Sequence, residues 1–359
     1  MPGPFDGIGR QWRDRLDQVR EYGIVRDGSV FRTGLCTSFV FRSEFERARA
    51  LERELVEAYR GVSLEDALCG SELDTGEGTC YLIESHDALE MRGQDREAVK
   101  TAILADLTLI YGIGQQTQER LKRRGYRTIA DLTRHPRYRK EAERLLAQIE
   151  SGDTAGLMRW IGRWHPASHP LVFLTCRFHA VEDFVFLDIE TLGLFSRPII
   201  LFGVARISGR RIGVQQYLIR DIPEEQAALA ATLAHLEGVD AALVTFNGRA
   251  FDLPYVRERL AYYGMPSRLA LPHFDVLHFS RRVWKERFSD CRLVTLERGL
   301  FGIERSGDVP SQMVPEFYEA YLRSGNPGPL VPVVEHNRQD VITLARLFAR
   351  LMEEWHACP

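Results

Sequence analysis

Two acidic side chains, Asp188 and Glu190, follow directly on a strongly apolar stretch that begins at Phe184. Because side chains alternate along a β-strand, both carboxylates point to the same face of the predicted strand. A strand this apolar is expected to be buried on both faces, so the two carboxylates repel each other and lose hydration. A divalent metal ion is the usual compensating charge for such a pair. A strand that simply ends in an acidic turn is the alternative.

Two further segments carry acidic side chains that would complete a metal site. Asp252 ends the motif Asn247-Gly-Arg-Ala-Phe251-Asp252, which lies between a predicted strand and a predicted helix. Open α/β sheets usually place their sites at that edge. His336 and Asp340 are four residues apart in a predicted C-terminal helix and therefore share one face of it. Such a pair alone is more typical of a helix surface, so the combination of segments indicates the site.

Residues 107–132 resemble a helix-hairpin-helix module, in which a Gly-x-Gly hairpin joins two short helices. Gly112 and Gly114 would permit a turn with positive φ and a close approach to a ligand. The helix that follows would offer free N–H groups to a phosphate. Between residues 115 and 144, ten basic side chains stand against four acidic ones. The predicted DNA contacts are Gly112, Gly114, Thr117, Lys122, Arg123 and Arg124.

This module is expected to grip the DNA backbone without reading sequence, so its binding should depend on salt. A helical connector with a solvated basic face is the alternative.

The composition is that of a soluble globular protein, with 45% hydrophobic and 27% charged residues. The net charge of −3 does not by itself indicate nucleic-acid binding. Such binding has to be judged from the local distribution of charge. The six cysteines are scattered without a Cys-x-x-Cys pair, which argues against a zinc site or a disulfide framework. No apolar run approaches the roughly 20 residues of a membrane span, and the N-terminus lacks a signal pattern. A cytoplasmic location is expected.

At 359 residues the chain is long for one hydrophobic core, so two or three domains are expected. The predicted divisions are an N-terminal accessory region (1–95), a helix-hairpin-helix-like DNA-binding module (96–150), a linker (151–180) and a catalytic domain (181–355). The last region reads as three strands, a helix, a strand and then helices. That order predicts an α/β fold of the RNase H type, a mixed sheet flanked by helices, preceded by a mainly helical N-terminal region.

The order and spacing of these motifs resemble the DEDD superfamily of 3′–5′ exonucleases over residues 180–350. The resemblance is especially close to the bacterial family of RNase H-like exonucleases typified by YprB. Supporting phrases include Gly307-Asp308-Val-Pro310 and Glu335-His336-Asn337-x-x-Asp340-Val. The resemblance implies that four carboxylates bind two divalent ions, Mg²⁺ or Mn²⁺. These carboxylates are Asp188, Glu190, Asp252 and Asp340.

One position departs from that superfamily. The residue that assists the attacking water there is a Tyr four residues before the last Asp, or a His five before it. This chain has His336 at the position of the tyrosine. An imidazole near two metal ions should be neutral and able to accept a proton from water. The alternative is that His336 only orients a water molecule or a phosphate oxygen.

The expected function is a metal-dependent 3′–5′ exonuclease that hydrolyses phosphodiester bonds by a two-metal-ion mechanism, with DNA favoured over RNA. Thr191 and Leu192 would flank the terminal nucleotide, and Asn247 and Phe251 would shape its pocket. The alternatives are a structure-specific endonuclease and a non-catalytic DNA-binding scaffold. The sequence points to no protein partner.

Overall fold

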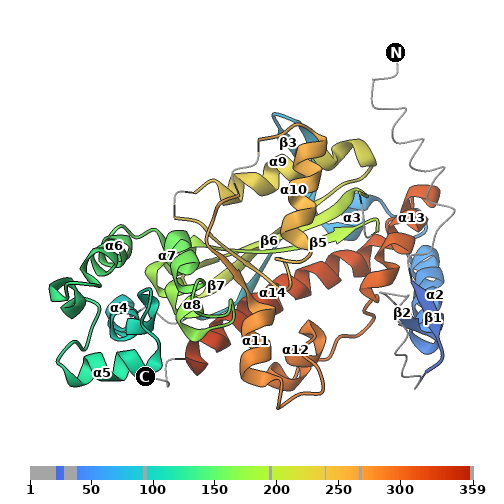
Figure 1. Cartoon of the computed structure of the whole chain (residues 1–359). Helices are drawn as coiled ribbons and strands as arrows, with labels where there is room; N and C mark the ends of the chain where they lie inside the picture. Colours follow the sequence, from blue (N-terminus) through green and yellow to red (C-terminus); the bar gives the residue numbers. More distant parts are fainter. Residues whose placement is uncertain are drawn as a thin grey trace.

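The computed structural model describes residues 22–27, 39–91, 95–193, 196–238, 240–266 and 269–355 (Figure 1). Its centre is a seven-stranded mixed sheet with the strand order β3-β4-β7-β6-β5-β8-β9. The strands are β3 (Ser71–Thr75), β4 (Gly78–Ala88), β5 (Phe184–Thr191), β6 (Ile199–Ser208), β7 (Arg211–Leu218), β8 (Ala242–Thr245) and β9 (His273–Asp275). β5 pairs antiparallel with β6 and parallel with β8. The predicted RNase H-like mixed sheet is therefore confirmed.

Helices cover both faces of this sheet. The helices of the C-terminal half of the chain are α9 (Glu225–Leu236), α10 (Asp252–Tyr262), α11 (Val276–Trp284), α12 (Leu293–Phe301), α13 (Val314–Ser324) and α14 (Leu330–Glu354). α9 packs on β4 and β6, and α14 packs on β5, β6 and β7. Phe184 and Phe186 of β5 meet Phe348 of α14, whereas Val185 and Leu187 join the core that contains α9. By alternation, Asp188 and Glu190 share the α14 face of β5.

The N-terminal third of the chain contributes to the same sheet. β4 pairs antiparallel with β7 over eight residues, from Tyr81 to Ala88, and β3 forms the outer edge. The segment expected to be a separate accessory region thus supplies two strands of the central sheet. Upstream lie β1 (Gly23–Val25), β2 (Phe39–Phe41), α2 (Arg42–Ala58) and α3 (Leu64–Leu68).

A group of short helices lies beyond the sheet, at the left of Figure 1. They are α4 (Arg96–Ala105), η1 (Leu107–Leu109), α5 (Gln115–Arg123), η2 (Asp131–Arg134), α6 (Arg139–Glu150), α7 (Thr154–Ile161) and α8 (Pro170–Leu174). Residues 151–180, expected as a linker, instead contain α7, α8 and the 3₁₀ turn Thr175–Phe178. Phe173 and Cys176 of this segment are fully buried, because they pack in the core under α14.

A buried ion pair fixes α10 against the start of β6. Glu225 accepts hydrogen bonds from the Ile199 amide (2.8 Å) and the Tyr263 hydroxyl (2.8 Å). The same carboxylate meets the Arg259 guanidinium at 2.5 Å, and both side chains are almost fully buried. Since α10 begins at Asp252, this pair positions one of the predicted acidic residues. No helix in the described parts of the chain is both long and apolar enough to cross a bilayer.

We expect Glu225→Ala to lower the free energy of unfolding by about 3–5 kcal/mol, because it leaves the Arg259 charge buried without its partner. Chemical denaturation of the purified protein measures this change. Glu225 begins α9, and Glu237 is exposed just after the end of that helix. Glu237→Ala should therefore stay within about 0.5 kcal/mol of the parent. Equal losses in the two variants would contradict the role given to the buried pair.

Candidate active site

Three elements bring the four predicted carboxylates into one cluster. Asp188 and Glu190 come from β5, and Asp252 is the first residue of α10. Asp340 lies in the middle of α14 and interacts electrostatically with Asp188, Glu190 and Asp252. A register shift between β5 and β6 follows Glu190, so the regular pairing ends where the acidic residues end.

The shared environment of these carboxylates opposes their ionisation. Burial raises the pKa of Asp188 well above its ordinary value, and the charges of Asp340, Glu190 and Asp252 add to the effect. Burial likewise raises the pKa of Glu190 to about 8, although His336 acts against the shift. Burial raises the pKa of Asp252 to about 7, while backbone hydrogen bonds, one of them from Ile189, partly offset it. The positive charge around the cluster is therefore too small to balance its four carboxylates.

A polar row under α14 holds Asp188 in place. Asn337 donates to the Asp188 carboxylate at 2.8 Å and accepts a bond of 2.9 Å from Gln216 of β7. Gly203 stands between Asp188 and Gln216 in the sheet register. A Cβ at Gly203 would lie 2.2 Å from the Asn337 Oδ1 atom, so only glycine leaves room for this side chain. Asn337 is fully buried and its amide is satisfied on both sides.

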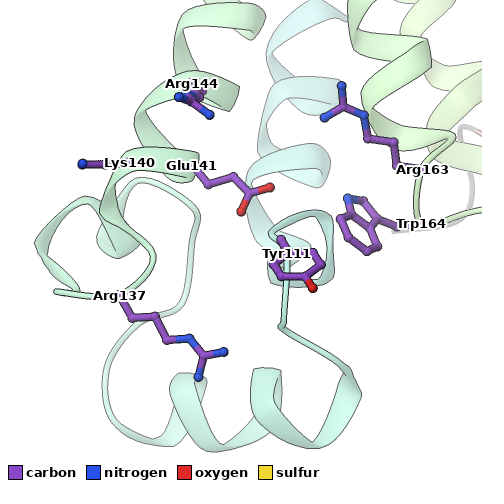
Figure 2. Close-up of a pocket in the computed structure, with 7 residues that line it drawn as sticks. All are labelled: Tyr111, Arg137, Lys140, Glu141, Arg144, Arg163 and Trp164. Carbon is purple, nitrogen blue, oxygen red and sulfur yellow. The ribbon is translucent and has the colours of Figure 1, made fainter.

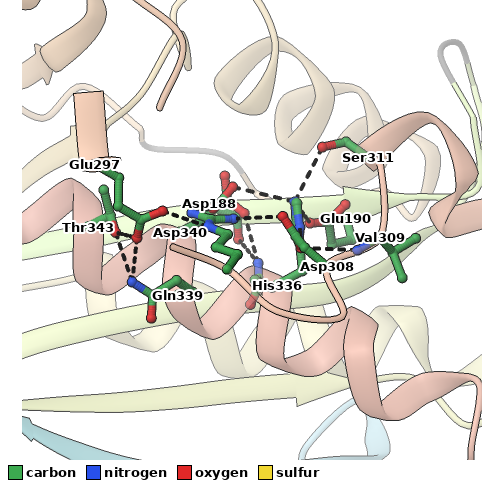
Figure 3. Close-up of polar contacts among 12 residues, drawn as sticks. Asp188, Glu190, Glu297, Asp308, Val309, Ser311, His336, Gln339, Asp340 and Thr343 are labelled. Carbon is green, nitrogen blue, oxygen red and sulfur yellow. Dashed lines mark hydrogen bonds and ion pairs between the residues drawn. The ribbon is translucent and has the colours of Figure 1, made fainter. Parts of the chain in front are cut away.

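His336 is held by a carboxylate of its own. Its Nδ1 lies 2.6 Å from Asp308, and its Nε2 points toward Glu190 at 3.8 Å and Asp340 at 3.6 Å (Figure 3). Ser311 Oγ lies 3.2 Å from the same Nε2. Burial lowers the pKa of His336, but Asp340, Asp308 and Glu190 outweigh it and raise the pKa to about 10. The carboxylates therefore keep the ring protonated here. The predicted neutral ring would require bound cations that offset the negative charge of these carboxylates.

Arg305 is the second positive charge at the cluster. Its guanidinium meets Asp340 at 2.5 Å and Glu297 at 2.6 Å, and its side chain is largely buried. Glu297 of α12 is also hydrogen-bonded by Gln339 and Thr343 of α14 (Figure 3). Burial opposes the charge of Arg305, but Asp340 and Glu297 more than compensate and raise its pKa.

Sequence reasoning assigned no role to Asp308, Asn337, Glu297 or Arg305. Asp308 and Asn337 stand inside the quoted phrases of the resemblance, which was the signal available for them. Arg305 follows the end of α12 in an irregular segment, where neither periodicity nor spacing marks it.

The four predicted nucleotide contacts have different surroundings. Thr191 donates to the Gly193 carbonyl (2.8 Å), and Phe251 is half-buried against Tyr255. Asn247 is exposed, with a left-handed φ of 68°, and its amide donates to Asp275. Leu192 is only 4% exposed, since it packs in the core on the α9 side of the sheet, so it offers no surface for a base. Leu194 of the same turn lies outside the described residues.

The predicted DNA contacts lie at opposite ends of α5. Gly112 has the expected positive φ of 78°, but Gly114 is extended with a φ of −88°, so the hairpin needs only one left-handed glycine. Thr117 lies in the first turn of the helix. Lys122 and Arg123 form its last turn, and Arg124 follows. All three basic side chains are exposed. After α5 the chain forms the 3₁₀ turn η2, and Asp131 at its start accepts hydrogen bonds from the Arg127 and Thr128 backbone amides.

The chemistry of the acidic cluster suits a hard divalent cation. Carboxylate oxygens are the ligands that Mg²⁺ and Mn²⁺ prefer, and the buried carboxylates lack neutralising charge. Among the residues with described placement, no three acidic, histidine or cysteine side chains are already arranged as a metal shell. Asp340 is engaged by Arg305, and Asp188 by Asn337. The donor types fit a metal ion, while the counter-ions in place are side chains of the protein.

Comparison with known proteins agrees with the fold. Residues 185–352 match the family model of the RNase H superfamily. The chain is also similar to "Uncharacterized protein YprB" of Bacillus subtilis (strain 168), with 34% identity over 194 residues. The matched stretch covers 51% of this chain and 46% of that protein, so the chain spans less than half the length of the relative. The stretch that matches the superfamily model contains all four carboxylates of the acidic cluster.

We expect Glu190→Gln to raise the free energy of unfolding at pH 8 in the presence of EDTA. The pKa of Glu190 rises from 4.5 to about 8 on folding, so stability is lost as the pH rises between these values. The variant should gain at pH 8 and lose that advantage near pH 4.5. A gain of about 1 kcal/mol would shift the melting temperature of a chain of this length by roughly 1–2 °C.

Thermal unfolding at the two pH values checks this, with Glu335→Gln, an exposed position on α14, as the control. If Glu190→Gln has the melting temperature of the parent at both pH values, ionisation of Glu190 does not destabilise the folded protein and the description of the cluster is wrong.

Proposed function

We propose that this protein is a metal-dependent 3′–5′ exonuclease that hydrolyses phosphodiester bonds, with DNA as its preferred polymer. The observation that carries the proposal is the convergence of Asp188, Glu190, Asp252 and Asp340, with His336 beside them. The match of residues 185–352 to the RNase H superfamily supports a nuclease. The order and spacing of the motifs favour the DEDD exonuclease type.

The four carboxylates would hold two divalent ions, Mg²⁺ or Mn²⁺. Bound there, such ions would polarise an attacking water and stabilise the leaving oxygen of the phosphodiester. Asn337 fixes the Asp188 carboxylate through its 2.8 Å hydrogen bond, and Tyr255 of α10 binds the Gly193 and Arg197 carbonyls. These bonds hold the end of β5 and the start of α10 in a constant relation. Pre-positioned ligands of this kind favour a tight geometry at a reacting centre.

His336 is the residue that would manage a proton. Asp308 holds Nδ1 and thereby aims Nε2 at the space between Glu190 and Asp340. An imidazole fixed through one nitrogen by a carboxylate is a common arrangement for a general base. Asp308 would act through the imidazole that it holds, so we assign it a positioning role.

The decisive experiment is digestion of 5′-labelled single-stranded DNA, duplex DNA and RNA with Mg²⁺ or Mn²⁺, beside Asp188→Asn. We expect a ladder of single-nucleotide steps from the 3′ end that disappears with EDTA and in the variant. Internal products from a circular DNA would instead identify an endonuclease. No cleavage of any polymer in Mn²⁺ would leave a DNA-binding scaffold as the function.

We expect Asp308→Asn to lower kcat roughly 10–100-fold with little change in KM, as is typical when a partner that orients a site residue is removed. Asp308 raises the pKa of His336, so its loss should lower that pKa. If the neutral imidazole is the base, the rising limb of the pH–rate profile then moves to lower pH.

The measurement is the pH dependence of kcat for the parent, Asp308→Asn and His336→Ala. Melting temperatures of the three proteins separate a catalytic loss from unfolding. An unshifted limb in Asp308→Asn would reduce Asp308 to a structural residue, and full activity in His336→Ala would remove the imidazole from the mechanism.

A further inference from the structure

A cavity of about 520 Å³ opens in the group of short helices, between α6, the turn after η1 and the turn after α7, away from the carboxylate cluster. Its lining consists of two aromatic, four basic and one acidic side chain. These are Tyr111, Trp164, Arg137, Lys140, Arg144, Arg163 and Glu141 (Figure 2). Its size is within the range of small-ligand sites, about 300–1,000 Å³. We call it the aromatic–basic pocket.

Its two aromatic rings are exposed and close to each other. Tyr111 is 69% exposed and Trp164 is 38% exposed, with ring centroids 5.8 Å apart and planes inclined by 48°. In Figure 2, Tyr111 lies between Trp164 and the side chains of residues 137–144. Large aromatic side chains that stay accessible on a folded protein commonly mark a binding surface.

The rings are mounted on a rigid frame. The Trp160 indole donates to the Leu109 carbonyl (3.0 Å), and His165 Nε2 lies 3.0 Å from the Asp106 carboxylate. These two contacts tie α7 and the turn after it, which carries Trp164, to the segment next to Tyr111. Ile110, just before Tyr111, and Ile113, two residues after it, are buried in the core. The platform is therefore fixed before any ligand arrives.

The basic side chains of the pocket are free to meet an anion. Arg137, Lys140, Arg144 and Arg163 are all exposed, and none forms an ion pair with an acidic side chain in the described parts of the chain. Glu141 is the single acidic residue of the lining, which leaves a surplus of three positive charges. Lys140 and Arg144 are one helical turn apart on α6 and therefore share a face.

We infer that the aromatic–basic pocket binds an unpaired segment of a single-stranded polynucleotide. Its bases would stack on Tyr111 and Trp164, and its phosphates would lie along Arg137, Lys140, Arg144 and Arg163. Aromatic platforms beside a basic track are the physical basis of single-strand binding, since every base offers a π-face whatever its sequence. A duplex hides those faces in its own stack, so the rings favour a single strand.

This inference rests on the proposed function, because the ligand is the polymer that the carboxylate cluster would cut. It differs from a helix-hairpin-helix grip on the duplex backbone, which would use the hairpin and the basic end of α5. The two surfaces adjoin, since a Cβ at Gly112 would lie 3.3 Å from the Arg137 guanidinium.

The test measures binding alone, in an Asp188→Asn background with EDTA, so that no strand is cut. Fluorescence anisotropy compares an oligothymidylate of about 15 nucleotides with an abasic strand and a duplex of the same length. We expect Tyr111→Ala and Trp164→Ala each to weaken oligothymidylate binding roughly tenfold and to leave abasic binding unchanged. Arg144→Ala should weaken both and flatten the salt dependence. An oligouridylate shows whether the pocket accepts RNA as well.

Matched controls are available elsewhere on the surface. Tyr262→Ala removes a ring that is 56% exposed on α10, and Arg323→Ala removes an exposed cation on α13. Neither should change binding. Tyr111→Phe and Trp164→Phe keep a stacking face, so they should bind like the parent even where an alanine variant is unstable.

Equal affinity of the parent and both alanine variants for oligothymidylate would overturn the inference, as would the same loss on the abasic strand. Phenylalanine variants as weak as the alanine variants would also overturn it. Cleavage of short oligonucleotides is measured separately with Asp188 intact. Cleavage without base-dependent binding defeats this inference alone, and base-dependent binding without cleavage of any polymer defeats the proposed nuclease alone.

Discussion

The crowding of four carboxylates at the end of β5 is the constraint on which the rest of this structure depends. Buried like charges raise one another's pKa values and weaken the folded state unless positive charge is supplied. The protein supplies it from two directions, with the Arg305 guanidinium on Asp340 and the His336 imidazole between Glu190 and Asp340. Neither reaches all four acids, so a fold built around this cluster retains a demand for cations.

The sheet and its helices are organised to hold that unfavourable cluster in one geometry. α14 lies across β5, β6 and β7 and brings Asp340 to Asp188, while Asn337 passes over Gly203 to meet Gln216. The Glu225–Arg259 pair fixes the helix that begins at Asp252. Apolar side chains buried on both faces of the sheet supply the stabilising energy. The acidic residues gather where β5 ends, at the margin of that apolar core. Such a division is common where a site is strained for function.

The part of the site with local periodicity was predictable from sequence. An apolar strand fixes the common face of Asp188 and Glu190, and helical spacing fixes that of His336 and Asp340. Contacts between residues that are distant in sequence left no comparable pattern in the sequence. Arg305 and Asp308 come from an irregular segment, and Leu192 turned into the core because the turn after β5 is tied back to Pro198 and Tyr255. Likewise, no local pattern shows that β4 would pair with β7, some 125 residues downstream in the chain.

The charge of the whole chain hides the division of work on its surface. The net charge of −3 is the balance of 47 basic and 50 acidic side chains, and this average conceals both the acidic cluster and the basic region. The two belong to different elements. The acids lie on β5, α10 and α14, and the bases lie on α6, just before it and just after α7. Phosphate contacts fix where a strand lies without reading its sequence, and stacking on Tyr111 and Trp164 is equally tolerant of sequence. A polynucleotide bound in the proposed way would be held without regard to its sequence, which suits the proposed nuclease.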